Sequence, residues 1–309
     1  DHRDLHSFPT RRSSDLFRMA DILILGYGPA GISAALYGLR AGLDVLIVGK
    51  DVGALARAHM IENYYGLEKP LSGPELAEVG KKQALALGAK IVDDEVTDLF
   101  FDGNDFVAGG LSGEYRGKAC IMATGSARKK QPLPGMAELE GHGVSYCAVC
   151  DAFFYRQKKV AVLGSGEYAL HEVSELLPMA SSVTLLTNGS ETTATFPETV
   201  TVETRKLAGL VGEGAFKGVR FEDGSEESFD GLFVALGSAS ATDLARKAGA
   251  AFDGANPVLG PDFQTTVPGL FAAGDCTGGT LQVAVAVGEG AVAGLAAIKY
   301  LREKRNASA

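Results

Sequence analysis

The first strongly patterned stretch of the chain indicates a strand, a turn and a helix. Residues 21–25 are apolar, the glycine-rich turn GYGPAG follows at 26–31, and residues 32–41 have the periodicity of a helix. Gly42 ends this pattern, and residues 43–48 form a second apolar run typical of a buried strand. The order predicts a βαβ unit with two parallel strands.

A second unit of the same kind occurs later in the chain. A strand over 159–163 leads into the turn GSGEYA at 164–169, followed by a helical pattern over 170–177 and a strand over 183–186. Two such units predict an α/β protein with two Rossmann-like domains, each doubly wound in three layers. Further strands are expected at 107–111, 119–122, 200–203, 218–222, 231–235 and 270–273, and further helices at 241–249 and 283–300.

Composition narrows the class of protein. The 309 residues are 46% hydrophobic with 40 glycines, which suits a glycine-rich α/β protein large enough for two cores. The net charge of -9 argues against nucleic acid as the main partner, because phosphate binding needs a concentrated basic face. No run of 18 uncharged apolar residues occurs, so no membrane span is expected. Four cysteines do not make a secreted disulfide framework, and we expect a cytoplasmic protein.

Residues 1–18 differ from everything that follows. They carry four arginines but no apolar run of roughly 7 to 15 residues, so they do not match a signal peptide. We interpret them as a non-native or disordered leader and expect the fold to begin near residue 19.

The sequence CAVCD at 147–151 is the main candidate for chemistry. Two cysteines separated by two residues can close a disulfide on one turn, and such pairs are a known redox module. The alternative is half of a structural zinc site, which would need two further ligands. Cys120 and Cys276 are far away in the sequence and His142 stands alone, so we expect no metal and interpret both cysteines as buried thiols.

The first glycine-rich turn is better suited to bind a dinucleotide than the second. The first permits close backbone approach, and the N-terminus of the helix after it can bind a pyrophosphate. The acid that usually holds a ribose is missing after its second strand, where Asp51 could serve or the ribose is held otherwise. The second unit has neither the Arg of an NADP site nor the acid of an NAD site, and residues 184–202 contain no Lys or Arg. Tyr168 also places a large ring where a pyrophosphate would approach, so the sequence argues against NAD(P)H binding.

As a set, these motifs resemble those of the low-molecular-weight thioredoxin reductases, over nearly all of residues 20–305. They occur in family order as GYGPAG at 26–31, ATG at 123–125, CAVCD at 147–151, GSGEYA at 164–169 and AGD at 273–275. The resemblance implies an FAD domain that the chain leaves and re-enters, residues 19–127 and 243–309. The CxxC would lie on an inserted, NAD(P)-binding-like domain, residues 128–242. Family enzymes are homodimers whose inserted domain rotates to carry the dithiol between flavin and thioredoxin.

The resemblance also implies roles for individual residues. Cys147 and Cys150 match the redox pair, with Cys150 facing the flavin, Cys147 attacking thioredoxin and Asp151 moving a proton. Phe153 and Phe154 match an aromatic pair on which thioredoxin docks; the alternative is core packing, with the two rings on opposite faces of a strand. Flavin-binding positions are matched by Gly26, Gly28, Pro29, Ala30, Gly31, Asn63, Thr124, Gly125, Gly274, Asp275, Gln282 and Val283.

This sequence differs from the NADPH-dependent members of the family at positions that bind the electron donor. NADPH-dependent members carry a His-Arg-Arg run where this chain has TNGS at 187–190, and an Arg where it has Leu281. Losing both features resembles the ferredoxin-linked, pyridine-nucleotide-independent flavin thioredoxin reductases. The sequence therefore predicts a flavin-dependent disulfide reductase that passes electrons from ferredoxin through FAD and the dithiol to thioredoxin.

Ferredoxins are typically acidic, so short basic clusters are candidate docking sites, with an ordinary solvated surface as the alternative. The two clusters are Arg128, Lys129 and Lys130, and Arg156, Lys158 and Lys159. Two other functions stay open. One is an NAD(P)H-dependent thioredoxin reductase with an atypical nucleotide site, and the other is a flavoprotein that serves a partner other than thioredoxin.

Overall fold

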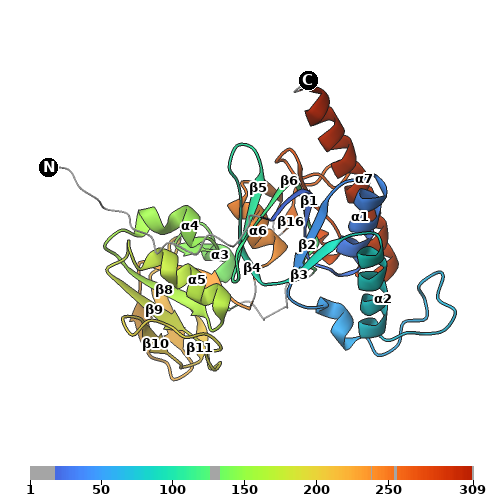
Figure 1. Ribbon diagram of the computed structural model, residues 1–309. Helices are drawn as coiled ribbons and strands as arrows, with labels where there is room; N and C mark the ends of the chain where they lie inside the picture. The colour runs from blue at the N-terminus through green and yellow to red at the C-terminus, as the bar shows by residue number, and fades with distance from the viewer. Residues whose placement is uncertain (1–17, 126–132, 238, 254–255, 308–309) are drawn as a thin grey trace.

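The computed structural model describes most of the chain (Figure 1), namely residues 18–125, 133–237, 239–253 and 256–307. Residues 1–17 of the predicted leader lie outside these ranges, and so does the basic cluster at 128–130. Arg18, which the prediction assigned to the leader, already belongs to strand β1 (Arg18–Leu25).

Seven strands form the first sheet, in the order β3-β2-β1-β6-β5-β4, with β17 beside β6. The strands β3, β2, β1, β6 and β17 run parallel, whereas β4, β5 and β6 pair antiparallel. The chain leaves this sheet after β6 and returns to it at β17. The remaining strands are β2 (Val45–Gly49), β3 (Lys90–Asp93), β4 (Val96–Phe101), β5 (Phe106–Gly110), β6 (Glu114–Met122) and β17 (Leu270–Ala272).

Three helices accompany this sheet: α1 (Pro29–Arg40), α2 (Gly73–Ala86) and α7 (Val283–Ala307). Successive side chains of β1 point to opposite faces, so Ile22 and Ile24 pack with α1 and α7, while Leu23 and Leu25 belong to the core cluster of the other face. The helices α1 and α7 touch through small residues, because a Cβ on Gly290 would lie 2.1 Å from the carbonyl oxygen of Ala30.

By length and composition alone, α7 could cross a membrane. Its buried residues, among them Ala286, Gly290 and Ala293, include those that pack against α1 and the first sheet, as in a helix that belongs to a protein core. The expectation that no segment spans a membrane stays a prediction. The helix continues to Ala307, well past the predicted end at residue 300.

Five parallel strands form the second sheet, in the order β10-β9-β8-β14-β7, and α5 (Glu167–Leu176) follows the second glycine-rich turn. Both predicted βαβ units are present, which confirms the α/β fold with two Rossmann-like sheets. The strands are β7 (Val144–Ser145), β8 (Lys159–Gly164), β9 (Ser182–Leu186), β10 (Thr201–Glu203) and β14 (Gly231–Ala235).

The smaller elements lie in the chain connections between these strands and helices. An antiparallel sheet is made by β11 (Leu207–Val211), β12 (Gly218–Phe221) and β13 (Glu226–Ser228), and a pair by β15 (Phe252–Asp253) and β16 (Asn256–Pro257). Short helices are α3 (Met136–Leu139), α4 (Ala148–Asp151), α6 (Ala241–Lys247), η1 (Gly53–Arg57), η2 (Ala152–Tyr155) and η3 (Asp275–Thr277).

One hydrophobic cluster joins the two sheets. It contains Leu99 of β4, Tyr168 and Val173 of α5, and Leu244 of α6, all of them fully buried or nearly so. The helix α6 packs against β4 and lies beside it in Figure 1. The second sheet is therefore held against the first by a shared apolar core as well as by the chain connections.

Candidate active site

The turn between β1 and α1 combines tight packing with one open position. Gly26 has φ +106°, and a Cβ there would lie 2.3 Å from the carbonyl oxygen of Ala123. A Cβ on Gly31 would lie 2.0 Å from the oxygen of Gly26, whereas one on Gly28 would meet nothing within 4 Å. Gly28 therefore faces open space at the N-terminus of α1, where backbone N–H groups can bind a pyrophosphate. Pro29 and Ala30 are the first residues of that helix.

A second turn, after β6, contributes an unsatisfied hydroxyl. The Oγ1 of Thr124 is buried and has no hydrogen-bond partner among the described residues. Burying a hydroxyl without a partner costs free energy, so such a group indicates a missing ligand. Gly125 follows with φ +74°, a conformation that favours glycine.

Residues far apart in the sequence meet at the same edge of the sheet. The Nδ2 of Asn63 donates to the Oε1 of Gln282 over 3.2 Å, and Val283 begins α7 directly afterwards. Gly274 has φ +84°, and a Cβ there would lie 2.8 Å from the Cβ of Ala30. Because β1, β6 and β17 are parallel, the turns after them lie together, as in dinucleotide-binding folds.

Asp275 begins η3 in the turn after β17, and burial raises the pKa of its carboxyl group. The turn is held by Glu289 of α7, whose Oε2 accepts from Gly274 N at 2.8 Å and from Thr277 Oγ1 at 3.1 Å. Glu289 was not predicted, and the available signal was an acid inside a helix of small apolar residues. The predicted cofactor residues thus lie on turns at this edge of the sheet, called the cradle below, and an open position at Gly28 with a buried free hydroxyl at Thr124 suits a dinucleotide such as FAD.

Two acids lie near the end of β2, where a dinucleotide-binding fold usually holds a ribose. Asp51 Oδ1 accepts from Gly53 N at 2.7 Å and so closes a local turn. Lys50, at the end of β2, pairs over 2.5 Å with Glu95, which is only 6% exposed. The second carboxylate oxygen of Glu95 is buried without a partner among the described residues. Glu95 is therefore a better candidate than Asp51 for a sugar hydroxyl.

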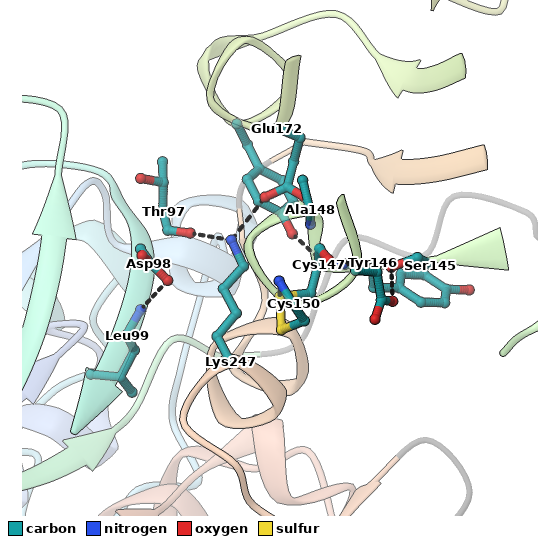
Figure 2. The surroundings of a disulfide bond; sticks show 12 residues. Thr97, Asp98, Leu99, Ser145, Tyr146, Cys147, Ala148, Cys150, Glu172 and Lys247 are labelled. Carbon is teal, nitrogen blue, oxygen red and sulfur yellow. Dashed lines mark hydrogen bonds and ion pairs between the residues drawn. A yellow bond between two sulfur atoms is a disulfide. The ribbon is translucent and has the colours of Figure 1, made fainter. Parts of the chain in front are cut away.

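The redox pair is closed in this structure. Cys147 and Cys150 form a disulfide at the start of α4, with their Cα atoms 5.3 Å apart (Figure 2). Cys147 is only 5% exposed, whereas Cys150 is exposed. Within the described ranges, no group of three or more His, Cys, Asp or Glu side chains is arranged to hold a metal ion. The zinc alternative therefore finds no support in that part of the chain.

A serine that the sequence reasoning missed connects the ends of the redox motif. The hydroxyl of Ser145 donates to Asp151 Oδ2 over 2.7 Å and accepts from Cys147 N over 3.1 Å. Cys150 N in turn donates to Cys147 Sγ over 3.1 Å. The carboxylate of Asp151 is thereby fixed beside the disulfide. The only available sequence signal was a hydroxyl residue two positions before the first cysteine.

Phe153 and Phe154 follow the disulfide on the 3-10 helix η2 and not on a strand. Both rings are largely exposed, at 69% and 67%, with their centroids 6.1 Å apart. The alternative of core packing on opposite faces of a strand is therefore wrong. Two neighbouring exposed aromatic rings beside a disulfide form a surface suited to a protein partner.

A later segment of the chain contacts the second glycine-rich turn. Thr193, in the segment after β9, donates its backbone N–H to Ser165 O over 2.8 Å, and its Oγ1 lies 3.2 Å from where a Cβ on Gly166 would stand. The predicted obstruction by Tyr168 is wrong, because that ring is 1% exposed and points into the core, where its hydroxyl donates to Tyr146 O. Helical residues near a turn can face inward, which the sequence pattern did not resolve.

Basic side chains near the end of β9 come from a later strand connection. Arg205 is paired with Glu203 at 2.6 Å and lies over the ring of Phe221. Lys206 is exposed, and its stem packs against Gly189 in the turn where family members carry arginines. Lys206 follows β10 and lies outside residues 184–202, so the local sequence pattern did not place it beside Gly189.

The two remaining cysteines behave as predicted. Cys120 and Cys276 are free and buried. Burial raises the pKa of the Cys276 thiol to about 12 and also raises that of Cys120. Both thiols are therefore held in the unreactive, protonated form.

Fold and site together define a flavin-type disulfide oxidoreductase, with a dinucleotide cradle on one sheet and a disulfide beside the other. The family model for pyridine nucleotide-disulphide oxidoreductases matches residues 20–290. A thioredoxin reductase from Peptoclostridium acidaminophilum is 34% identical over 304 residues, covering 91% of this chain and 96% of that protein.

Two solved structures extend the comparison. The atypical thioredoxin reductase TRi from Desulfovibrio vulgaris Hildenborough is 42% identical with a TM-score of 0.84, covering 91% of this chain and 98% of that one. A ferredoxin-flavin thioredoxin reductase from Clostridium acetobutylicum is 30% identical with a TM-score of 0.73, covering 93% and 100%. The chain therefore belongs to the low-molecular-weight thioredoxin reductase family and is a flavin-dependent disulfide reductase of that kind.

Proposed function

We propose that this enzyme takes electrons from ferredoxin, without a nicotinamide nucleotide, and uses the Cys147–Cys150 dithiol to reduce thioredoxin. The observation that carries the choice of donor is the second glycine-rich turn, where Thr193 hydrogen-bonds to Ser165 and its hydroxyl lies close to Gly166. The turn after β9 also lacks the acid or arginine that distinguishes the ribose of NAD from that of NADP.

One of the similar structures supports the same donor, since the Clostridium acetobutylicum protein is a ferredoxin-flavin thioredoxin reductase. A donor of single electrons needs a cofactor that stores them, and FAD, when bound, supplies that conversion to an electron pair. The residues of the cradle would hold FAD. Gly28 would leave room for the pyrophosphate, and the buried hydroxyl of Thr124 would hydrogen-bond to the cofactor.

The chain's own residues then carry the exchange. Once the disulfide is reduced, the thiolate of Cys147 attacks a sulfur of the thioredoxin disulfide, which forms a mixed disulfide and frees one thioredoxin thiolate. The thiolate of Cys150 next attacks the sulfur of Cys147, which closes Cys147–Cys150 again and releases reduced thioredoxin. Asp151, held by Ser145, moves the proton at Cys150.

The docking surfaces belong to the same proposal. Phe153 and Phe154 are exposed beside the disulfide and would receive thioredoxin. In the second basic cluster, Arg156 and Lys158 are exposed and suit an acidic ferredoxin, whereas Lys159 is paired with Glu227 over 2.9 Å. The first cluster, residues 128–130, lies outside the described residues and stays a candidate.

The proposal also covers the domain boundaries, the oligomeric state and the location of the enzyme. Residues 19–127 and 243–309 form the FAD domain, and residues 128–242 form the inserted domain with the dithiol. As in the family, the enzyme works as a cytoplasmic homodimer.

A second candidate function is favoured by one observation. Lys206 lies beside Gly189 at the end of β9 and could meet a nucleotide 2′-phosphate. An NADPH-dependent thioredoxin reductase would then need the segment around Thr193 to move away from the turn.

Variants of the dithiol test the proposed chemistry. With reduced ferredoxin as donor and oxidised thioredoxin as acceptor, the wild-type enzyme should generate free thioredoxin thiols, measured by a thiol reagent. Cys150→Ser should abolish that activity, because the mixed disulfide cannot be resolved. The matched control Cys120→Ala, which alters a buried thiol outside the pair, should leave activity close to wild type. Thioredoxin reduction that survives Cys150→Ser would contradict the dithiol mechanism.

A further inference from the structure

A buried ion pair connects the two halves of the molecule. Lys247, the last residue of α6, places its Nζ 2.8 Å from Glu172 Oε1 on α5, and the two side chains are only 1% and 0% exposed. Two charges removed from water persist only where further hydrogen bonds satisfy them. Lys299 and Glu303 on α7, by contrast, form a solvent-exposed pair at 78% and 67%.

The additional hydrogen bonds reach both the first sheet and the redox motif. Lys247 Nζ donates to the carbonyl oxygen of Thr97 in β4 over 3.0 Å, and Glu172 Oε2 accepts from Ala148 N over 2.6 Å. Ala148 lies between the two disulfide cysteines. A continuous polar chain thus runs from Thr97 through Lys247 and Glu172 to Ala148, as Figure 2 shows.

The sulfur proposed to attack thioredoxin is covered in this arrangement. Cys147 is 5% exposed and Ala148 is fully buried, whereas Phe153 and Phe154 lie open to a partner. The partner surface is therefore available while the attacking atom is not. Exposing Cys147 requires the segment that carries it to move, and that segment is fixed through Ala148 to Glu172 and through Lys247 to β4.

We propose that Lys247 is a positioning residue whose ion pair with Glu172 clamps the disulfide segment against the first domain and must open before Cys147 can attack thioredoxin. This inference rests on the proposed role of Cys147. It assigns to one ion pair the control of access to Cys147, because β4 and the loop between the cysteines are joined through that pair.

Removal of the lysine should release the segment. In Lys247→Met the carboxylate of Glu172 is left buried without its counter-charge, which favours any arrangement that brings it to water. Glu172→Gln leaves the lysine in the same position and also weakens the clamp. If both residues act through the same ion pair, their effects should not add. Cys147 should then be no more accessible in the double variant than in the single variant with the larger effect.

The test measures thiol accessibility and not turnover. The purified flavoprotein is reduced with a phosphine and treated with a maleimide, and the alkylation rate of each cysteine is followed by mass spectrometry. In Lys247→Met, Cys147 should react about tenfold faster than in wild type. Lys299→Met, which removes an exposed pair, should change nothing.

Buried thiols elsewhere serve as internal controls. Cys120 and Cys276 should stay as slow in Lys247→Met as in wild type, because the clamp concerns only the dithiol segment. If the alkylation rates of all three buried cysteines rose in parallel, Lys247 would stabilise the fold in general. If the rate at Cys147 did not change, the ion pair would not restrict access to that thiol. Either result overturns the inference. Alkylation involves neither ferredoxin nor thioredoxin. A negative result would therefore overturn the clamp without bearing on the proposed electron transfer from ferredoxin to thioredoxin.

Discussion

Ser145 links both ends of the redox motif through a single hydroxyl group. It fixes the backbone of Cys147 and the carboxylate of Asp151 at the same time, over 3.1 and 2.7 Å. A proton-transfer group is effective only when it is held within reach of the atom that it serves. Positioning of Asp151 therefore depends on a residue outside the CxxC motif.

Ser145→Ala should slow thioredoxin reduction by roughly tenfold, because a hydrogen bond to a charged group contributes about 1.5 kcal/mol or more. Flavin content should not change, since Ser145 belongs to β7 of the second sheet and is not among the cradle residues. Stopped-flow mixing of the reduced enzyme with thioredoxin measures the exchange step directly. A rate equal to that of wild type would show that Asp151 needs no such support.

Several residue-level features could be predicted and others could not. The glycines of the first turn and the two cysteines follow from local spacing, and they form the turn and the disulfide that were expected. The direction of the Tyr168 ring, by contrast, depends on which side of α5 meets the core. The partner of Lys247 lies 75 residues away along the chain, a pairing that no local pattern contains.

At the scale of single elements, the β1–α1 turn separates a structural role of glycine from a ligand-binding one. Gly31 is required by the fold itself, since a Cβ would collide with the oxygen of Gly26 at 2.0 Å. Gly28 has φ -69° and open space around it, so the chain without cofactor tolerates a side chain there.

Two alanine variants test this division. Gly31→Ala should lower the melting temperature of the flavin-free protein by about 4 °C or more, because overpacking costs about 2 kcal/mol. Gly28→Ala should melt like wild type but bind FAD about tenfold more weakly, since the methyl group takes the place of a pyrophosphate. Calorimetry and flavin titration measure the two effects. Equal FAD affinity in Gly28→Ala and wild type would place the pyrophosphate elsewhere.

Element prediction was least successful for short strands with mixed burial. β3 and β4 were not predicted, because β3 is exposed at both ends and β4 ends in two exposed phenylalanines, so neither shows the alternation of a half-buried strand. The segment with Phe153 and Phe154 was read as a possible strand, although it continues α4 as a 3-10 helix. Turns that follow apolar, parallel strands were predicted well, since both glycine-rich turns lead into helices.

For the whole molecule, the contacts that decide function join distant segments. Asn63 meets Gln282 in the flavin cradle, and Thr193 contacts the second glycine-rich turn at Ser165. Periodicity identifies the strands that bring such residues to one edge, but it does not show how a later loop folds back. The sequence therefore predicted the first glycine-rich turn and its surroundings more fully than the second turn, on which the choice of electron donor depends.

The most direct test of this account is anaerobic reduction of the bound flavin by each possible donor. The purified enzyme is mixed in turn with NADPH, NADH and reduced ferredoxin, and the visible absorbance band of the flavin is followed. The account predicts rapid bleaching by ferredoxin and no bleaching by either nucleotide, because the second glycine-rich turn is contacted by Thr193. Rapid bleaching by either NADPH or NADH would contradict it.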